Sequence, residues 1–176
     1  MTETIAYEVT GKTGEIEFRK YPRMVLATVT NDRDDSGFNL LFAYITGNNR
    51  TKMKISMTTP VITSENTSEK IPMTAPILSD EKLMSFVMPA GKREEDMPDP
   101  LDPRVKITTL HPREVAVIQF KGFARREDVD TAKGRLLDGL QKAGITAAGQ
   151  PVLMRYNAPW TPGFLRRNEV GIEIAR

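Results

Sequence analysis

Two segments that lie ninety positions apart constrain the fold of this chain more than any other feature of its sequence. Residues 21–27 read Tyr-Pro-Arg-Met-Val-Leu-Ala, and residues 111–117 read His-Pro-Arg-Glu-Val-Ala-Val. Each is followed by a turn, a segment with helical periodicity and a strand-like segment. Repeated supersecondary units produce this spacing, so we predict two copies of one β-α-β-β unit.

The two predicted units form one α+β domain over residues 1–176. The halves cover about residues 7–88 and 105–176, and residues 89–104 form the loop between them because they contain four prolines and a charged run. Two such units related by a pseudo-twofold axis give an antiparallel sheet, curved or closed into a distorted barrel. One main helix from each unit should pack on it.

A shorter repeat lies inside the first half. Residues 54–62 and 70–78 share the pattern Lys-Ile-x-Met-Thr-x-Pro, and apolar residues alternate within each copy. Period two predicts two strands, each ended by its proline and joined by a polar hairpin loop at residues 64–69. Met57 and Met73 are either core filler or one wall of an apolar pocket, and their strand period favours the core.

Periodicity predicts the remaining elements as well. Strands are expected at residues 7–9, 15–30 with an interruption at 21–22, 82–88, 105–108, 114–120, 150–158 and 168–175. A second helix is expected at residues 127–143, ended by Gly144.

The first predicted helix, residues 37–46, is apolar almost all round. Its expected core stripe has the spacing i, i+3, i+4, i+7 and consists of Phe38, Leu41, Phe42 and Ile45. Further apolar side chains lie off that stripe, namely Leu40, Ala43 and Tyr44. Something must therefore cover a second side of this helix, either a loop or partner subunit, or a flat apolar ligand in a groove.

Composition excludes several classes of site. The chain has no cysteine and one histidine, which argues against thiol chemistry, zinc binding and a serine-histidine-aspartate triad. The net charge is +2 without a basic tract, so nucleic acid is not an expected partner. The sequence shows neither a signal peptide nor a spanning segment, which predicts a cytoplasmic protein without membrane insertion.

Glu169 lies at the head of the last predicted strand, after Arg166 and Arg167. An inward-pointing carboxylate at this position is either paired with an arginine or serves as the counter-charge of a cationic ligand. Because a buried charge needs a partner, we favour the paired structural role.

Five short segments together resemble the SOUL haem-binding protein family. They are residues 15–21, the pattern Tyr-Ile-x-Gly-x-Asn at 44–49, residues 54–61, the pattern Tyr-Asn-x-Pro at 156–159, and residues 167–170. The resemblance implies a distorted barrel of two β-α-β-β units, the fold shared with bacterial effector domains of the gyrase-inhibitor type. It also implies binding of haem or related porphyrins, without a settled enzymatic activity.

The resemblance further implies that a tetrapyrrole lies in an apolar groove along the first helix. Here that groove would be lined by Phe38, Phe42 and Ile45, with Leu41 on the same stripe. Lys20 occupies the position of a histidine proposed as axial iron ligand in one branch of the family. This leaves His111 and Tyr21, at equivalent positions of the repeat, as candidate ligands.

Other family positions also differ in this chain. Ala43 and Pro162 occupy positions of basic residues thought to meet the propionates, so we predict Arg166 and Arg167 as substitute anchors for them. Gly171 replaces the tryptophan usual after Asn-Glu-Val, which predicts open space beside the last strand.

Three functions are compatible with these residues, all with a small hydrophobic ligand as partner. The first is a carrier or buffer of haem or another tetrapyrrole. The second is an effector-binding domain for lipophilic cations, with Glu169 as counter-charge. The third is a hydrolase that acts on a bound hydrophobic ligand through a carboxylate and water. We rank it last because no positioned base is evident, and we assign no catalytic residue.

Overall fold

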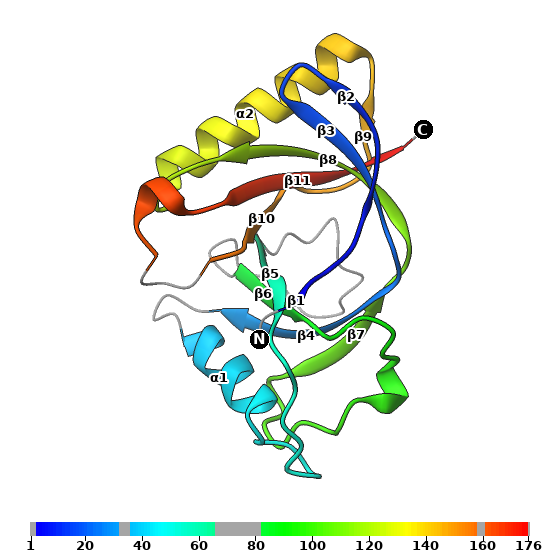
Figure 1. Cartoon of the computed structure of the whole chain (residues 1–176), viewed down its shortest axis with the longest axis vertical. Helices are drawn as coiled ribbons and strands as arrows, with labels where there is room; N and C mark the ends of the chain where they lie inside the picture. Colours follow the sequence, from blue (N-terminus) through cyan, green and yellow to red (C-terminus); the bar gives the residue numbers. More distant parts are fainter. Residues whose placement is uncertain (1–2, 32–35, 66–81, 158–160, 176) are drawn as a thin grey trace. The chain divides into compact units, whose positions relative to one another are not determined.

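The computed structural model describes residues 3–31, 36–65, 82–157 and 161–175, and it confirms the α+β class (Figure 1). The chain forms two compact units. Unit 1 comprises Met1–Ile5 and Arg23–His111, and unit 2 comprises Ala6–Pro22 and Pro112–Arg176.

Unit 1 is an antiparallel sheet with one helix. Its strands are hydrogen-bonded in the order β5 (Thr58–Glu65), β6 (Lys82–Val87), β4 (Met24–Asn31) and β7 (Lys106–Leu110). The short β1 (Glu3–Thr4) pairs in parallel with β5. Helix α1 (Ser36–Ile45) packs on this sheet, and the single turn η1 (Glu94–Asp96) lies in the loop before β7.

In unit 2, antiparallel strands again form the sheet, and the helix is longer. The strand order is β2 (Glu8–Thr13), β3 (Ile16–Tyr21), β8 (Arg113–Phe120), β11 (Asn168–Ala175) and β10 (Val152–Arg155). The two-residue β9 (Thr146–Ala147) pairs with β11. Helix α2 (Arg126–Ala143) lies along one face of this sheet, and the turn η2 (Gly163–Leu165) precedes β11 (Figure 1).

Each unit contains strands that come from the other half of the sequence: unit 2 includes β2 and β3, and unit 1 includes β7. β3 directly precedes β4 along the chain, yet it pairs with β8, so that Arg19 lies opposite Val115. β7 directly precedes β8, yet it pairs with β4, with Leu110 opposite Met24. The predicted repeat halves and the compact units therefore divide the chain at different places. Among the described strands, hydrogen bonds do not close a barrel.

Most predicted elements are present, but the first copy of the short repeat is not a strand throughout. Residues 54–57 precede the strand, which begins at Thr58 and continues past Pro60 to Glu65. The backbone N–H of Ile55 donates to the carbonyl of Ile45 at 2.7 Å, which ties this segment to the end of α1 instead of to a neighbouring strand. The second copy, residues 70–78, lies outside the described residues.

The core of unit 2 explains one glycine in α2. Leu136 and Leu140 of α2 are buried against the alternate residues of β3 that face the helix, Ile16 and Phe18. A Cβ at Gly139 would lie 2.5 Å from Cδ1 of Ile16, closer than any carbon–carbon contact allows. Glycine at this position therefore permits the close approach of α2 to β3.

Candidate functional site

The apolar side chains of α1 face in directions that differ from the prediction. Leu41 and Ile45 are buried as expected, but Phe42 is 49% exposed. Tyr44 takes its place in the core, where its hydroxyl donates to the carbonyl of Pro98 at 2.7 Å. The prediction that Phe42 lies in the core was therefore wrong. A tyrosine can be buried in place of a phenylalanine when its hydroxyl finds a hydrogen-bond acceptor, as that of Tyr44 does.

Phe42 is the outermost of three aromatic rings. Its ring stacks on Phe38 with centroids 6.0 Å apart and planes at 11°, and Phe38 meets Phe86 edge-on at 5.3 Å. Phe86 is fully buried in the core of unit 1. The stack therefore leads from the core to the surface, and it ends on a helix without a charged residue.

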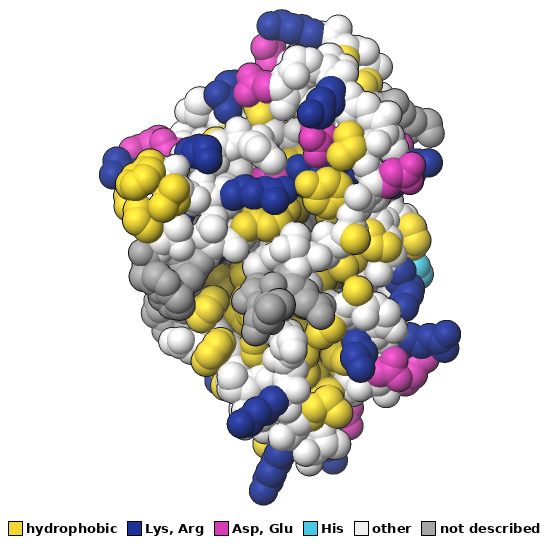
Figure 2. All heavy atoms as spheres, viewed as in Figure 1, with side chains coloured by type: hydrophobic (Ala, Val, Ile, Leu, Met, Phe, Trp, Pro, Cys, Tyr) yellow, Lys and Arg dark blue, Asp and Glu magenta, His cyan; other side chains and the backbone are white. Residues whose placement is uncertain are grey.

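The loop after α1 carries a second exposed apolar side chain. Asn49 is buried, and its side-chain amide donates to the carbonyls of Tyr44 and Met53, both at 2.9 Å. Its side-chain oxygen accepts from the N–H of Met53, also at 2.9 Å. These bonds hold the loop, and Met53 remains 45% exposed. Figure 2 shows hydrophobic atoms at the surface in the region of α1.

A second cluster, in unit 2, is polar and buried. Arg19 of β3 donates from its two terminal nitrogens to the two carboxylate oxygens of Glu169 of β11, at 2.8 and 2.6 Å. Both side chains are fully buried. The sequence predicted that Glu169 is paired with an arginine, and the structure identifies Arg19 as that arginine.

Further donors surround the same carboxylate. Tyr156, Gln119 and Arg167 each donate a hydrogen bond to it. Burial by itself raises the pKa of Glu169, but the hydrogen bonds from Arg19 and Tyr156 and the nearby cations outweigh it, so the pKa is lowered. The carboxylate is therefore ionised and saturated with donors.

Strand alternation explains why these groups meet. On β3, Ile16 and Phe18 face α2, whereas Glu17, Arg19 and Tyr21 face the opposite side of the sheet. On that opposite side the guanidinium of Arg19 also donates to Glu17 at 2.7 Å and to the hydroxyl of Tyr21 at 2.9 Å. The alternation of β3 can be read from the sequence, but the strand order β3-β8-β11, which brings Arg19 close to Glu169, cannot.

The predicted anchors and iron ligands lie in different surroundings. Arg166 donates from Nε to the carbonyl of Thr161 and lies over the ring of Phe123. Arg167 is partly exposed and donates to Tyr7 as well as to Glu169. The predicted site residues are divided between the units: unit 1 contains Phe38, Leu41, Phe42, Ile45 and His111, and unit 2 contains Tyr21, Arg166, Arg167 and Glu169.

The two candidate iron ligands differ in accessibility. His111 is exposed. Tyr21 is buried, and burial raises the pKa of its hydroxyl despite the nearby Arg19, which disfavours the phenolate that would ligate iron. Among the described residues, no group of three or more histidine, aspartate or glutamate side chains is arranged to hold a metal ion.

The open space expected at Gly171 is absent. A Cβ at this position would lie 2.8 Å from Cε of Met154 and 3.1 Å from Cγ1 of Val115. Met154 of the neighbouring strand β10 therefore fills the space beside β11 that a larger residue would need.

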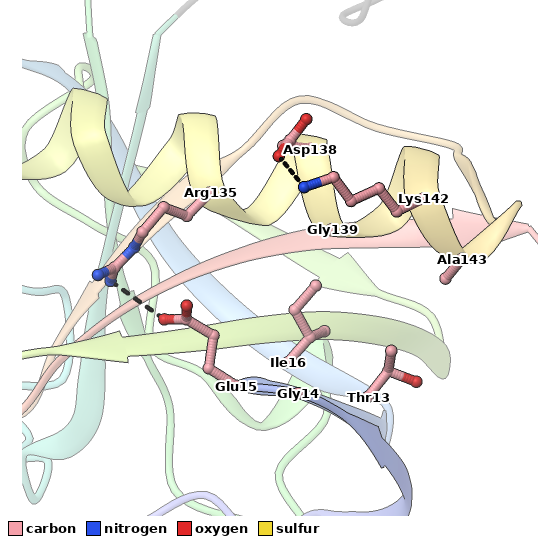
Figure 3. Close-up of a pocket in the computed structure, with 9 residues that line it drawn as sticks. All are labelled: Thr13, Gly14, Glu15, Ile16, Arg135, Asp138, Gly139, Lys142 and Ala143. Atoms are coloured by element: carbon pink, nitrogen blue, oxygen red, sulfur yellow. Dashed lines mark ion pairs between the residues drawn. The ribbon is translucent and has the colours of Figure 1, made fainter.

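The described residues of unit 2 line two of the surface hollows. The first, of about 370 Å³, is bounded by the turn between β2 and β3 and by the last turns of α2 (Figure 3). Its charged side chains pair with each other, Arg135 with Glu15 at 3.4 Å and Lys142 with Asp138 at 3.0 Å. The second, of about 320 Å³, is lined by residues of β2, β3 and β8 that include Arg19 and Gln119. Since the charges of the first are mutually satisfied, we do not assign it a ligand.

Sequence comparison identifies the family. A family model described as SOUL heme-binding protein matches residues 2–173. The chain belongs to the SOUL heme-binding protein family. The resemblance predicted from the five short segments is thereby confirmed. Among curated proteins, none matches the sequence significantly.

Solved structures with the same fold share little sequence with this SOUL protein. The EcmrR C-terminal domain has a TM-score of 0.62 at 10% identity, with 97% of this chain and 98% of that chain covered. A hydrolase from Listeria innocua has a TM-score of 0.62 at 16% identity, with 94% of each chain covered. SAV2435 bound to tetraphenylphosphonium has a TM-score of 0.52 at 10% identity, with 92% and 94% covered. At these identities the likeness shows the fold alone.

No helix in the described part of the chain is long and apolar enough to cross a membrane.

Proposed function

We propose that this SOUL protein binds haem or a related tetrapyrrole on the apolar surface of α1, as a carrier or buffer. The observation that carries the proposal is Phe42, half exposed at the end of an aromatic stack on a helix without charged residues. Membership of the SOUL heme-binding protein family supports a tetrapyrrole as the flat apolar ligand.

The chemistry of this surface fits a flat macrocycle. Burying apolar area is favourable by roughly 25 cal/mol per Å², and an aromatic side chain contributes a large, rigid contact. Phe42 is already held by Phe38, so little side-chain freedom remains to be lost on binding. We therefore expect stacking against Phe42 to supply much of the affinity.

Iron coordination is a separate question. His111 is exposed and would serve as a nitrogen ligand, whereas Tyr21 would first have to lose both its burial and its bond from Arg19. Arg166 and Arg167 remain proposed propionate anchors, but a propionate would have to share or displace their present partners. The proposal therefore rests on apolar stacking and needs neither a strong axial ligand nor these anchors.

The lipophilic-cation alternative depends on Glu169. SAV2435, which has the same fold, binds the lipophilic cation tetraphenylphosphonium. In this chain, however, the Glu169 carboxylate already pairs with Arg19 and Arg167. A cationic ligand would have to compete with two guanidinium groups for this carboxylate, which favours the tetrapyrrole. A hydrolase function stays last in rank, since the saturated Glu169 is a poor base.

Haem titration of the intact protein tests the proposal. We expect a shifted Soret band on titration with haem, and a loss of affinity of about tenfold or more in Phe42→Asp, because a carboxylate would be buried under the macrocycle. Leu101→Asp is the matched control, since Leu101 is also an exposed apolar residue of unit 1. An unshifted Soret band, or equal binding by both variants, would refute the proposal.

A further inference from the structure

Three large apolar side chains are exposed on two adjoining loops of unit 2. They are Phe123, Phe164 and Leu165, with exposed fractions of 54%, 75% and 58%. We call this set the η2 patch. It lies where η2, orange-red in Figure 1, meets the loop that leads into α2, and Figure 2 shows hydrophobic atoms gathered at that place.

The patch is held in place by several contacts. The N–H of Gly122 donates to the carbonyl of Gly163 at 3.0 Å, and the buried Asn168 side chain donates to the carbonyl of Gly122 at 2.8 Å. The ring of Phe123 packs on Gly163, where a Cβ would lie 2.7 Å from it. Arg166 lies over the same ring at 4.6 Å. The two loops thus form one rigid surface that presents apolar side chains outward.

The backbone around Phe123 supports the same conclusion. Gly122 has φ of 107° and Ala124 has φ of 56°, a conformation that alanine rarely adopts. The turn therefore directs Phe123 away from the core of unit 2 at some conformational cost. Exposed aromatic residues that folding does not require point to an external partner.

The charges around the η2 patch are mostly positive. Residues 121–126 and 161–167 contain five cations and no acidic residue, namely Lys121, Arg125, Arg126, Arg166 and Arg167. The nearest acidic side chains along the chain are Glu127 and Asp128 at the start of α2, and Glu169 of β11. Asp128 accepts a hydrogen bond from the N–H of Arg125, and Glu169 pairs with Arg167, which leaves four cations outside that ion pair. The local balance remains positive.

We propose that the η2 patch docks this protein onto anionic lipid bilayers. Phenylalanine and leucine side chains would enter the interfacial layer, while the surrounding lysine and arginines contact lipid headgroups. This contact needs no spanning segment. A bilayer suits the patch because its small set of protruding apolar side chains is surrounded by cations, whereas a protein interface usually has a broad apolar centre.

Vesicle co-sedimentation of the intact protein tests the proposal. The wild type should pellet with vesicles of phosphatidylcholine and phosphatidylserine but stay in solution with phosphatidylcholine alone, and high salt should release it. The double variant Phe164→Ser/Leu165→Ser and the charge variant Lys121→Glu/Arg126→Glu should each lower the partition coefficient by about tenfold or more. Leu137→Ser is the control, since Leu137 is an exposed apolar residue of α2 outside the patch.

Circular dichroism shows whether each variant is folded, and these substitutions are at exposed positions, so folding should be retained. Absence of binding to the anionic vesicles, or equal binding by wild type and both patch variants, would overturn the proposal. A wild-type dimer that Phe164→Ser/Leu165→Ser converts to a monomer would also overturn it, because a second copy would then cover the patch.

Discussion

The guanidinium of Arg19 and the carboxylate of Glu169 form a bidentate, fully buried ion pair across three strands of unit 2. The residues are 150 positions apart, and β8 lies between their strands. The ion pair therefore connects β3 and β11, the two neighbours of β8, through side chains, in addition to the backbone hydrogen bonds that each strand makes with β8.

Removing one member of this pair should destabilise the protein strongly. Arg19→Met leaves a buried carboxylate without its main partner, and we expect the free energy of unfolding to fall by about 3–5 kcal/mol. The double variant Arg19→Met/Glu169→Leu should recover part of that loss, because neither charge remains. Urea denaturation measures both. A loss below about 1 kcal/mol in Arg19→Met would contradict a structural role.

The acid limb of stability should depend on Glu169. The lowered pKa means that the folded state holds the ionised form, so this contribution is present above the ordinary pKa of 4.5 and is lost as the pH falls through the folded value. Wild-type stability should thus decline below about pH 4.5, and Glu169→Gln should show a shallower decline. Melting temperatures of wild type and variant, measured as the pH is lowered through this range, test the prediction. If both fall in parallel, Glu169 is not the group responsible.

The alkaline limb should depend on Tyr44. Burial, with a smaller effect of Asp99, raises the pKa of its hydroxyl to about 12. A raised pKa gives a contribution that is complete below the ordinary value of 10 and is lost as the pH rises towards 12. Tyr44→Phe also removes the bond to Pro98 and should cost about 1 kcal/mol at neutral pH. Equal alkaline melting of variant and wild type would argue against this origin.

The close packing at Gly171 should appear as a coupling with Met154. We expect Gly171→Ala to lower stability by about 1–2 kcal/mol, since the added carbon meets Met154 and Val115. In a Met154→Ala background the same change should cost less, because the contact at 2.8 Å is gone. A double-mutant cycle in urea measures the difference, and a coupling of zero would show that the site relaxes without Met154.

Iron ligation makes a spectroscopic prediction. If haem bound at α1 is ligated by His111, the variant His111→Ala should change the Soret position while leaving stacking on Phe42 intact. The bound-haem spectrum and the haem affinity are measured together. An unchanged spectrum with unchanged affinity excludes this histidine and leaves stacking alone.

The bounds of α1 were predicted to within one residue, but its orientation was not. The apolar spacing of residues 37–46 is correct for a helix, yet spacing cannot distinguish Phe42 from Tyr44 as the core residue. The deciding contact is the carbonyl of Pro98, 54 positions away from Tyr44, which accepts the phenol hydrogen bond. Such a long-range acceptor leaves no trace in a periodic pattern.

The polar cluster shows the same limit. Alternation in β3 and β11 indicates on which face Arg19 and Glu169 lie, and the need of a buried carboxylate for a cation was predicted from its chemistry. Arg19 joins Arg167 as a partner of Glu169 because of the strand order, in which β3 pairs with β8 and not with β4. Sequence order suggests the opposite pairing, so the cluster became visible only in three dimensions.

The placement of β3 also matters while the chain is being synthesised. β3 can pair at once with β2, which precedes it, but the partner of its other edge, β8, follows about a hundred residues later. At 5–20 residues per second this edge therefore stays unpaired for on the order of 5–20 seconds. During this interval Ile16 and Phe18 are open to wrong pairing, and the charged Glu17 and Arg19 between them discourage it. The residues that later form the buried polar cluster thus protect the nascent strand from aggregation.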